Sequence, residues 1–288
     1  MENVLLISGG GSKIVYSIAI INTIIQKLKV NYDLYCGVSA GAIVACFLAQ
    51  FPEEENELGI VKLTELWNTI KKEHIFKNWE PLGKLQSIYK RSLFDNSPLY
   101  SLIYKNISIQ KIRASGKKVK IGAININTGK YQIFTEQDDN LLLGILGSCA
   151  FPGIFQPTKI KEDSFIDGGF MSPFSLIADN YSNIKRVDVI LTSPAKKSNK
   201  KVVSPSVIDI LNNCVDMLME DKVSGDIDKI LMHNKLVEIG AEPEMHKISL
   251  NVIRPEEMLS EKLLDFRDSL MKKMFIMGEK DAEKIFGV

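Results

Sequence analysis

The sequence has few of the residues that build disulfide frameworks and metal sites. Its 288 residues include four cysteines and three histidines. The cysteines are widely spaced and form no C-x-x-C pair: Cys36, Cys46, Cys149 and Cys214. Isolated cysteines of this kind are typical of buried free thiols in a reducing compartment. We therefore expect no disulfide frame, and no metal site, because no His, Cys or acidic cluster has ligand spacing.

Long apolar runs are also missing. A membrane-spanning helix needs about 18 or more nearly uninterrupted apolar residues. The longest candidate, residues 141–155, is broken by glycines and Pro152. The apolar start at Val4 runs directly into a glycine-rich turn, which is not the pattern of a signal peptide. The sequence therefore predicts a cytoplasmic protein without a membrane-spanning segment, and export without a cleaved signal stays open.

Neither sign of charge dominates the chain. The 36 basic and 35 acidic residues leave a formal net charge of +1, which is no electrostatic reason to bind nucleic acid or another polyanion. Two local basic runs, residues 117–118 and 196–201, fall between expected elements and are interpreted as solvated loops. The sequence does not predict an oligomeric state.

What the chain does contain is an alternation of strand and helix patterns. Residues 4–7 are all apolar, as expected of a parallel strand covered on both faces. A glycine triplet follows, and residues 14–28 carry apolar side chains at helical spacing. The later expected elements are a strand at 32–36, helices at 40–50 and 58–75, a hairpin of 119–126 with 131–134, a helix at 141–150, strands at 164–166 and 187–191, a helix at 207–222, a strand at 248–253 and a helix at 260–277 with Ser260 as its N-cap.

No internal repeat or low-complexity linker divides the chain. The pattern predicts one α/β domain over residues 1–288, with three layers: a largely parallel central sheet and helices on both faces. The chemistry-bearing motifs fall within residues 3–195, and residues 200–288 add helices and a strand that complete the fold. Residues 76–112 are short-patterned and irregular, with scattered aromatic residues.

The most informative motif is the pentapeptide Gly37-Val38-Ser39-Ala40-Gly41, between an expected strand and an expected helix. In this setting G-x-S-x-G forms a nucleophile elbow, whose strained turn admits only small residues around the serine. The motif alone is equally compatible with a simple tight turn. Its context decides between the two.

A second motif, Gly9-Gly10-Gly11, links the first strand to the first helix. Glycines there leave backbone N–H groups unobstructed at a helix N-terminus, which suits the oxyanion of a tetrahedral intermediate. A tight turn and a phosphate cradle are the other readings. The dinucleotide fingerprint G-x-G-x-x-G fails, because position 14 is isoleucine.

A third motif, Asp167-Gly168-Gly169, follows a short expected strand. By itself such a tripeptide is usually a turn. Since ligand sites in open α/β sheets form at the carboxyl ends of strands, we expect this carboxylate at the same sheet edge as the other two motifs.

Together, the three motifs resemble the patatin-like phospholipase family in order, spacing and context. The resemblance includes a basic residue, Lys13, after the glycine triplet. Residues 148–157 are similar to the family's block of small residues and prolines, and residues 167–173 have its D-G-G-x-x-x-P form. The similarity covers residues 3–195, and the remainder is similar only in general layout.

The resemblance implies a catalytic dyad without a histidine. Ser39 would be the nucleophile and Asp167 its general base, while Gly9, Gly10, Gly11 and the Ala40 amide would form the oxyanion hole. Gly37 and Gly41 would shape the elbow, Gly168 and Gly169 the aspartate turn, and Lys13 would support the site. The chain departs from the family at Ile14, where a further glycine is common, and this puts the width of the turn and the donor geometry in question.

Histidine offers an independent check on the dyad. Chain order permits a Ser-Asp-His triad, because His233 and His246 both follow Asp167, whereas His74 precedes it. However, the elbow follows a single earlier strand, which is too early for the α/β-hydrolase fold. The dyad is therefore favoured. It requires Asp167 to be shielded from water and near Ser39, because a solvated carboxylate is a weak base.

The family implies hydrolysis of acyl esters in phospholipids or lysophospholipids, with transient contact to a membrane surface and no cofactor. Two alternatives stay open: an acyl-thioesterase or protein deacylase with the same dyad, and an inactive lipid-binding or regulatory scaffold. Residues 76–112 are either a lid or acyl-chain wall, or ordinary core.

Overall fold

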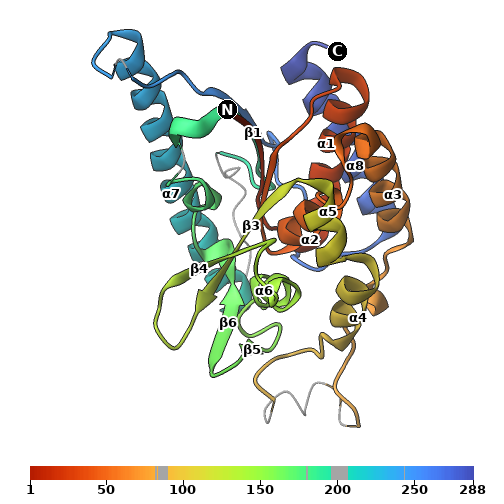
Figure 1. Cartoon of the computed structure of the whole chain (residues 1–288). Coiled ribbons are helices and arrows are strands. Elements are labelled where there is room, and N and C mark those ends of the chain that lie inside the picture. The colour runs from red at the N-terminus through yellow and green to blue at the C-terminus, as the bar shows by residue number, and fades with distance from the viewer. Residues whose placement is uncertain (82, 84–89, 180, 196–206, 243) are drawn as a thin grey trace.

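The computed structural model describes the chain except residues 82, 84–89, 180, 196–206 and 243 (Figure 1). The basic run at residues 196–201 therefore lies outside the described residues. Among the described residues, no helix combines the length and the apolar character needed to cross a bilayer.

One mixed sheet forms the middle layer. Its strands are β1 Glu2–Ile7, β2 Leu34–Val38, β3 Lys118–Asn125, β4 Tyr131–Thr135, β5 Thr158–Ile160, β6 Asp163–Asp167, β7 Ile184–Ile190 and β8 Ser249–Ile253. The order is β5-β6-β3-β2-β1-β7-β8, with β4 paired to β3 off this path. Neighbours from β3 to β8 are parallel, while β4, β5 and β6 form antiparallel pairs. The sheet is largely parallel, as predicted.

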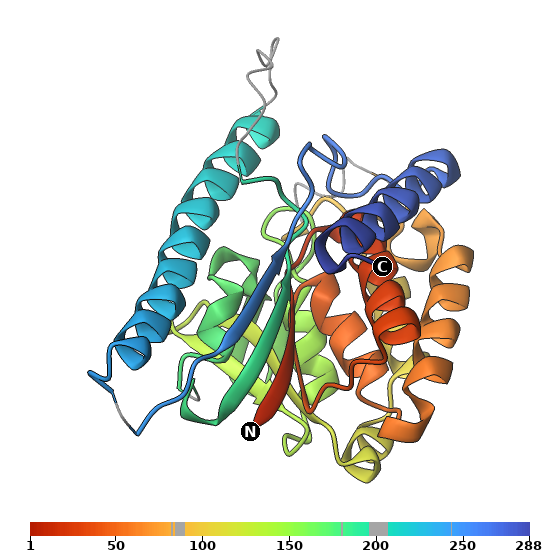
Figure 2. The ribbon, with the colours of Figure 1, turned by 90° about the horizontal axis from the view of Figure 1, so that it is seen from above.

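Helices cover both faces of the sheet. They are α1 Ile14–Leu28, α2 Ala40–Leu48, α3 Asn56–Thr69, α4 Ser97–Asn106, α5 Ile109–Ser115, α6 Leu141–Ser148, α7 Val207–Glu238 and α8 Asp268–Phe286. Figure 2 views the sheet near its edge, with α7 on one side and α1, α3 and α8 on the other. Alternate residues of β1 divide accordingly: Leu5 and Ile7 join the larger core with α1, and Val4 and Leu6 join the smaller core with α7.

The C-terminal helix begins later than predicted. Helix α8 starts at Asp268, not at Ser260. The Ser260 hydroxyl instead forms a local turn with the backbone of Lys262. Residues 263–266, here called the strap, then cross the start of α1 in non-helical conformation, because backbone groups of Leu263 and Asp265 bond to Ser12.

Several other expectations need correction. Residues 76–112 are less irregular than predicted, because they contain α4 and most of α5; buried Leu99 and Ile103 hold α4 against the core. Helix α7 extends 16 residues beyond the predicted end at 222, to Glu238, and the predicted helix at 58–75 ends at Thr69. Strand β5 was not predicted.

Lys117 is not in a solvated loop. Its side chain is buried, and its ammonium group donates a hydrogen bond of 2.8 Å to the Tyr32 carbonyl oxygen. The adjacent Lys118 begins β3. A basic pair in the sequence thus marks the entry to a strand, where one lysine satisfies a buried carbonyl group.

Candidate active site

Ser39 lies in the sharp turn between β2 and α2. Its backbone angles are φ 54° and ψ −131°, a conformation that residues with side chains rarely adopt. A Cβ atom on Gly37 would lie 2.3 Å from the Gly41 carbonyl oxygen, and one on Gly41 would lie 2.5 Å from the Ile7 carbonyl oxygen. The chain is therefore too tightly packed for larger residues at these two positions, as the elbow motif predicts.

A buried serine holds this turn in place. The Ser39 amide donates a hydrogen bond of 2.8 Å to Ser148 Oγ, and that hydroxyl donates one of 2.6 Å to the Gly122 carbonyl oxygen. Ser148 is the last residue of α6 and is fully buried. It therefore joins the elbow to β3 through one side chain.

Asp167 is hydrogen-bonded to the side chain of Ser39. The serine hydroxyl donates a hydrogen bond of 2.7 Å to Asp167 Oδ2, and the Gly169 amide donates one of 2.7 Å to Oδ1. The residue is 2% exposed. Burial raises the pKa of the Asp167 carboxyl to about 7, although the hydrogen bonds from Ser39 and Gly169 partly oppose this shift.

The sheet register explains why these residues meet. Strand β3 lies between β2 and β6. Val38 is level with Gly122 on one side of β3, and Asp167 is level with Ala123 on the other. Val38, which directly precedes Ser39, and Asp167 therefore lie on opposite sides of β3 at nearly the same height.

This arrangement corrects one expectation. Strand β6 runs antiparallel to β3, so Asp167 does not extend past the carboxyl end of a parallel strand. The β5–β6 hairpin instead brings the chain back toward the site, and β6 ends level with the elbow. A Cβ atom on Gly168 would lie 2.0 Å from the Gly122 carbonyl oxygen, so the chain turns away there against β3.

The glycine loop, residues 9–11, packs directly on Ser39. A Cβ atom on Gly9 would lie 2.7 Å from Ser39 Cβ. Gly10 has φ 147° and Gly11 has φ 56°, both strained for other residues. In the part of the chain that the structure describes, the amides of Gly10, Gly11 and Ala40 donate no backbone hydrogen bond outside the helices and strands.

Thr192 supports this loop from the end of β7. Its hydroxyl donates a hydrogen bond of 2.5 Å to the Gly9 carbonyl oxygen. A Cβ atom on Gly10 would lie 2.4 Å from the same hydroxyl. Thr192, two residues after β7, thus holds the glycine loop in place at the Gly9 carbonyl group.

The departure at Ile14 does not fill the loop. Ile14 is fully buried in the larger core at the first position of α1. Lys13, just before it, ends a short 3-10 helix, Gly11–Lys13, and its amide donates to the Gly10 carbonyl oxygen at 3.1 Å. The isoleucine is thus a core residue in this chain.

A narrow apolar pocket opens beside Ser39 and Asp167. Its volume is about 50 Å³. Its walls come from α2, α3, α4, the segment after α6 and the strap; the apolar members are Ala40, Ile43, Trp67, Ile75, Leu99, Cys149, Phe151, Phe155, Leu263, Leu264 and Phe266. Ile75 and Leu99 flank or belong to the stretch predicted as a lid or wall, while its Phe76 and Phe94 pack against each other in the core.

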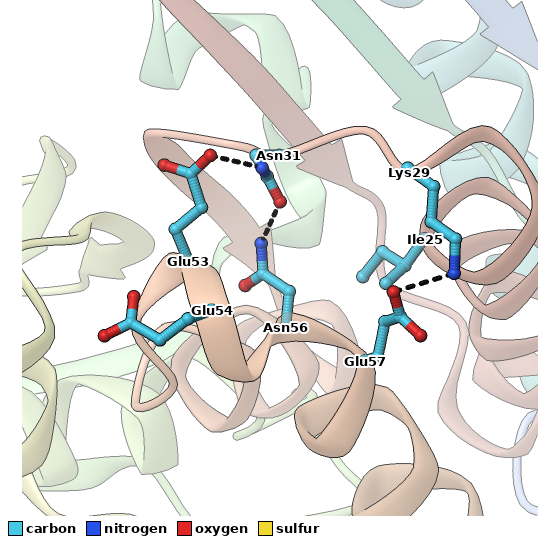
Figure 3. Close-up of a pocket in the computed structure, with 7 residues that line it drawn as sticks. All are labelled: Ile25, Lys29, Asn31, Glu53, Glu54, Asn56 and Glu57. Atoms are coloured by element: carbon cyan, nitrogen blue, oxygen red, sulfur yellow. Dashed lines mark hydrogen bonds and ion pairs between the residues drawn. The ribbon is translucent and has the colours of Figure 1, made fainter.

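A second, larger hollow lies elsewhere, between the end of α1 and the start of α3 (Figure 3). It has a volume of about 530 Å³ and is lined mainly by polar side chains. Asn31 bonds to Glu53 and Asn56, and Lys29 pairs with Glu57 at 2.7 Å. These groups satisfy one another, and none of the predicted site residues lines this hollow. Within the described part of the chain, no group of ligating side chains could hold a metal ion.

The histidines lie apart from Ser39. His233 contacts Glu242 at 3.1 Å and the His246 carbonyl oxygen at 3.1 Å. The His246 ring bonds to the carbonyl oxygen of Ile184, which is opposite Glu2 at the amino end of β1. His74 is exposed and accepts a hydrogen bond from the Lys71 amide.

Sequence reasoning assigned no role to three parts of this site: Ser148, Thr192 and the strap. Ser148 belongs to the small-residue block at residues 148–157, so the resemblance includes this position but does not predict its hydrogen-bond partners. Thr192 and the strap carry no local motif. Their contacts join residues far apart in the chain and are visible only in the fold.

The fold is that of an α/β protein with a largely parallel central sheet. A family model described as patatin-like phospholipase matches residues 5–178, and the chain belongs to this family. A curated relative is the probable lipid hydrolase 463L of Invertebrate iridescent virus 6, 26% identical over 80% of this chain and 85% of that protein.

Two further matches extend the comparison. Uncharacterized protein L620 of Acanthamoeba polyphaga mimivirus is 25% identical over 58% of this chain and 60% of its own length. Among solved structures, VipD from Legionella pneumophila aligns with 99% of this chain and 67% of its own, with a TM-score of 0.49 and 11% identity.

Proposed function

We propose that this chain hydrolyses fatty-acyl esters of phospholipids or lysophospholipids, with Ser39 as nucleophile and Asp167 as general base. The observation that carries the proposal is the 2.7 Å hydrogen bond from Ser39 Oγ to a carboxylate that is 2% exposed. Family membership and the relative named a probable lipid hydrolase favour a lipid substrate.

In the first step, Ser39 Oγ attacks the ester carbonyl carbon while its proton passes to Asp167 Oδ2. A carboxyl with a pKa of about 7 is well matched to taking up and returning a proton near neutral pH. The carbonyl oxygen becomes an oxyanion, for which the amides of the glycine loop and of Ala40 are the proposed donors. Each such donor typically contributes about 2.7–4 kcal/mol to transition-state stabilisation.

Collapse of this intermediate breaks the bond to the alcohol, which leaves as lysophospholipid after taking the proton from Asp167. The acyl group remains on Ser39 as an ester. Water then attacks the acyl carbon, Asp167 accepts the water's proton and returns it to Ser39 Oγ, and the fatty acid departs. Each proton taken from a nucleophile is thus returned to a leaving group, and no cofactor enters either half.

The test is product analysis by mass spectrometry after incubation with mixed phospholipid vesicles. We expect wild-type protein to release free fatty acid and lysophospholipid, and the Ser39→Ala and Asp167→Asn variants to release at least 10³-fold less. Parallel reactions contain acyl thioesters. Thioester cleavage without release from phospholipid would replace the lipid substrate by a thioester. Absence of both reactions from folded protein would contradict the enzyme proposal and favour a scaffold.

A further inference from the structure

The strap comes from a part of the chain that the family model does not match. The match ends at residue 178, yet Leu263, Leu264 and Phe266 line the pocket beside Ser39. These residues lie between β8 and α8, more than 80 positions beyond the matched region. The pocket beside Ser39 therefore has one wall that comes from outside the segment matched by the family model.

Ser12 attaches this wall to the glycine loop. Its amide donates a hydrogen bond of 2.9 Å to the Leu263 carbonyl oxygen. Its hydroxyl is 3.2 Å from the same oxygen and accepts a hydrogen bond of 3.0 Å from the Asp265 amide. Ser12 is fully buried, so these bonds are shielded from competition with water.

The strap also touches the loop directly. A Cβ atom on Gly11 would lie 2.2 Å from the Leu263 carbonyl oxygen. Beyond the strap, Arg267 pairs with the buried carboxylate of Asp265 at 2.7 Å. Ser12 thus holds the backbone of the strap on both sides of Leu264, at Leu263 and at Asp265.

The size of the pocket gives this wall a consequence. A volume of about 50 Å³ is far below the roughly 300–1,000 Å³ of pockets that enclose drug-sized ligands. At about 10–15 Å³ for each water-sized group, it accommodates about four such groups. A longer acyl chain needs space that the side chains of the strap now occupy.

We propose that Leu264 and Phe266 of the strap are specificity-determining residues that limit the length of the acyl chain. This inference rests on the proposed function, because it assigns the pocket to the acyl group. With the strap in place, the chain favours short acyl groups. Truncating either side chain extends the pocket and admits longer ones.

The first measurement is kcat/KM for p-nitrophenyl butanoate and p-nitrophenyl decanoate. We expect Leu264→Ala and Phe266→Ala each to raise the decanoate-to-butanoate ratio by about tenfold or more, and Leu264→Trp to lower it. The control is Leu231→Ala, on α7, where the leucine is 53% exposed; this variant should keep the wild-type ratio. Circular dichroism melting curves establish that each variant is folded.

The second measurement does not depend on hydrolysis. Trp67 lines the pocket, and the chain has two tryptophans, so Trp79→Phe leaves Trp67 as the single reporter. In the Ser39→Ala, Trp79→Phe background, titration with butanoate and decanoate should change the Trp67 fluorescence. We expect Leu264→Ala to tighten decanoate binding relative to butanoate by about tenfold.

The two measurements separate the two proposals. Chain-length-dependent binding without hydrolysis would contradict the proposed function and support the strap. Hydrolysis with the same decanoate-to-butanoate ratio in wild type, Leu264→Ala, Phe266→Ala and Leu264→Trp would support the proposed function. It would overturn the proposal that the strap limits the length of the acyl chain. Absence of both binding and hydrolysis in folded protein would overturn both.

Discussion

At the scale of single residues, the site holds a carboxylate where water is excluded. Asp167 is 2% exposed, and burial raises its pKa to about 7, against about 3.9 in an unfolded chain. The contribution of Asp167 to the free energy of unfolding is therefore fully present below about pH 3.9. It is lost as the pH rises through about 7, because the carboxyl stays protonated to a higher pH in the folded than in the unfolded chain. Above that pH, the buried charge opposes folding by about 4 kcal/mol.

Replacing Asp167 with asparagine removes this charge and keeps the shape of the side chain. We expect Asp167→Asn to raise the free energy of unfolding by about 2–4 kcal/mol at pH 8, with little difference near pH 4. Urea unfolding at several pH values measures this difference. If the variant and the wild type differ by the same free energy of unfolding at pH 4 and at pH 8, a raised pKa of Asp167 is contradicted.

Ser148 holds Ser39, the proposed nucleophile, through the Ser39 backbone amide. Its hydroxyl accepts from the Ser39 amide and donates to the Gly122 carbonyl group. We expect Ser148→Ala to lower the free energy of unfolding by about 1–3 kcal/mol, because two buried groups lose their partner. We also expect it to lower kcat about 10–100-fold with a smaller change in KM, since the nucleophile is displaced rather than the pocket.

Ser17 provides the control for this experiment. It is equally buried, in α1, and its hydroxyl has no hydrogen-bond partner among the described residues. Ser17→Ala should leave both stability and kcat near wild-type values. Equal losses in the two variants would indicate general core damage and contradict a positioning role for Ser148.

At the scale of elements, the two late histidines sit at the wrong end of the sheet for catalysis. The ring of His246 bonds to Ile184 at the start of β7, and His233 contacts His246 and Glu242. Ser39 follows the opposite, carboxyl end of β2. These contacts tie α7 and the segment after it to the sheet, so we interpret both histidines as structural.

We therefore expect His233→Gln and His246→Gln to keep ester hydrolysis within about threefold of wild type, while each lowers the melting temperature. Steady-state kinetics on a soluble ester and calorimetry measure the two effects. Loss of activity by about 10³-fold or more in either variant, with the fold intact, would require a triad.

Elements that depend on local pattern were predictable. Helix α1 has the predicted bounds, because its apolar residues repeat at helical spacing and are nearly all buried. The direction of β6 was not, since a five-residue strand looks the same in parallel and antiparallel pairs. Ser260 looked like an N-cap, but the bonds between Ser12 and the strap delay α8 until Asp268.

The candidate site was predictable in part. The elbow and the glycine loop are contiguous motifs, and their placement at one sheet edge followed from the strand-helix alternation. The pairing of Ser39 with Asp167 came only from the family resemblance, because no local pattern relates residues 128 positions apart. The strap was unpredictable for the same reason. For residues 76–112, Leu99 lines the pocket, as proposed for a lid or wall, while Phe76 and Phe94 lie in the core, as the alternative holds.

At the scale of the whole molecule, the C-terminal part completes both the sheet and its cover. Strand β8 pairs with β7, and α8 packs on α1 so closely that a Cβ atom on Gly278 would lie 2.4 Å from the Tyr16 carbonyl oxygen. Met274 and Ala282 of α8 are fully buried in the larger core.

A chain ending at residue 195 keeps every predicted catalytic residue but loses these contacts. We expect it to be inactive and without a cooperative unfolding transition, because a broad apolar face of α1 becomes exposed. Urea unfolding monitored by circular dichroism measures this. A cooperative transition close to that of the full chain would show that the motif-bearing part folds alone.

The bond between Ser12 and Leu263 joins positions 251 residues apart. A ribosome adds about 5–20 residues each second, so roughly 12–50 s separate the synthesis of the glycine loop from that of the segment that closes it. During this interval the nascent chain carries the serine elbow but lacks one wall of the pocket. The pocket beside Ser39 is therefore complete only when translation is nearly finished, so the proposed control of acyl-chain length is the last feature of the site to form.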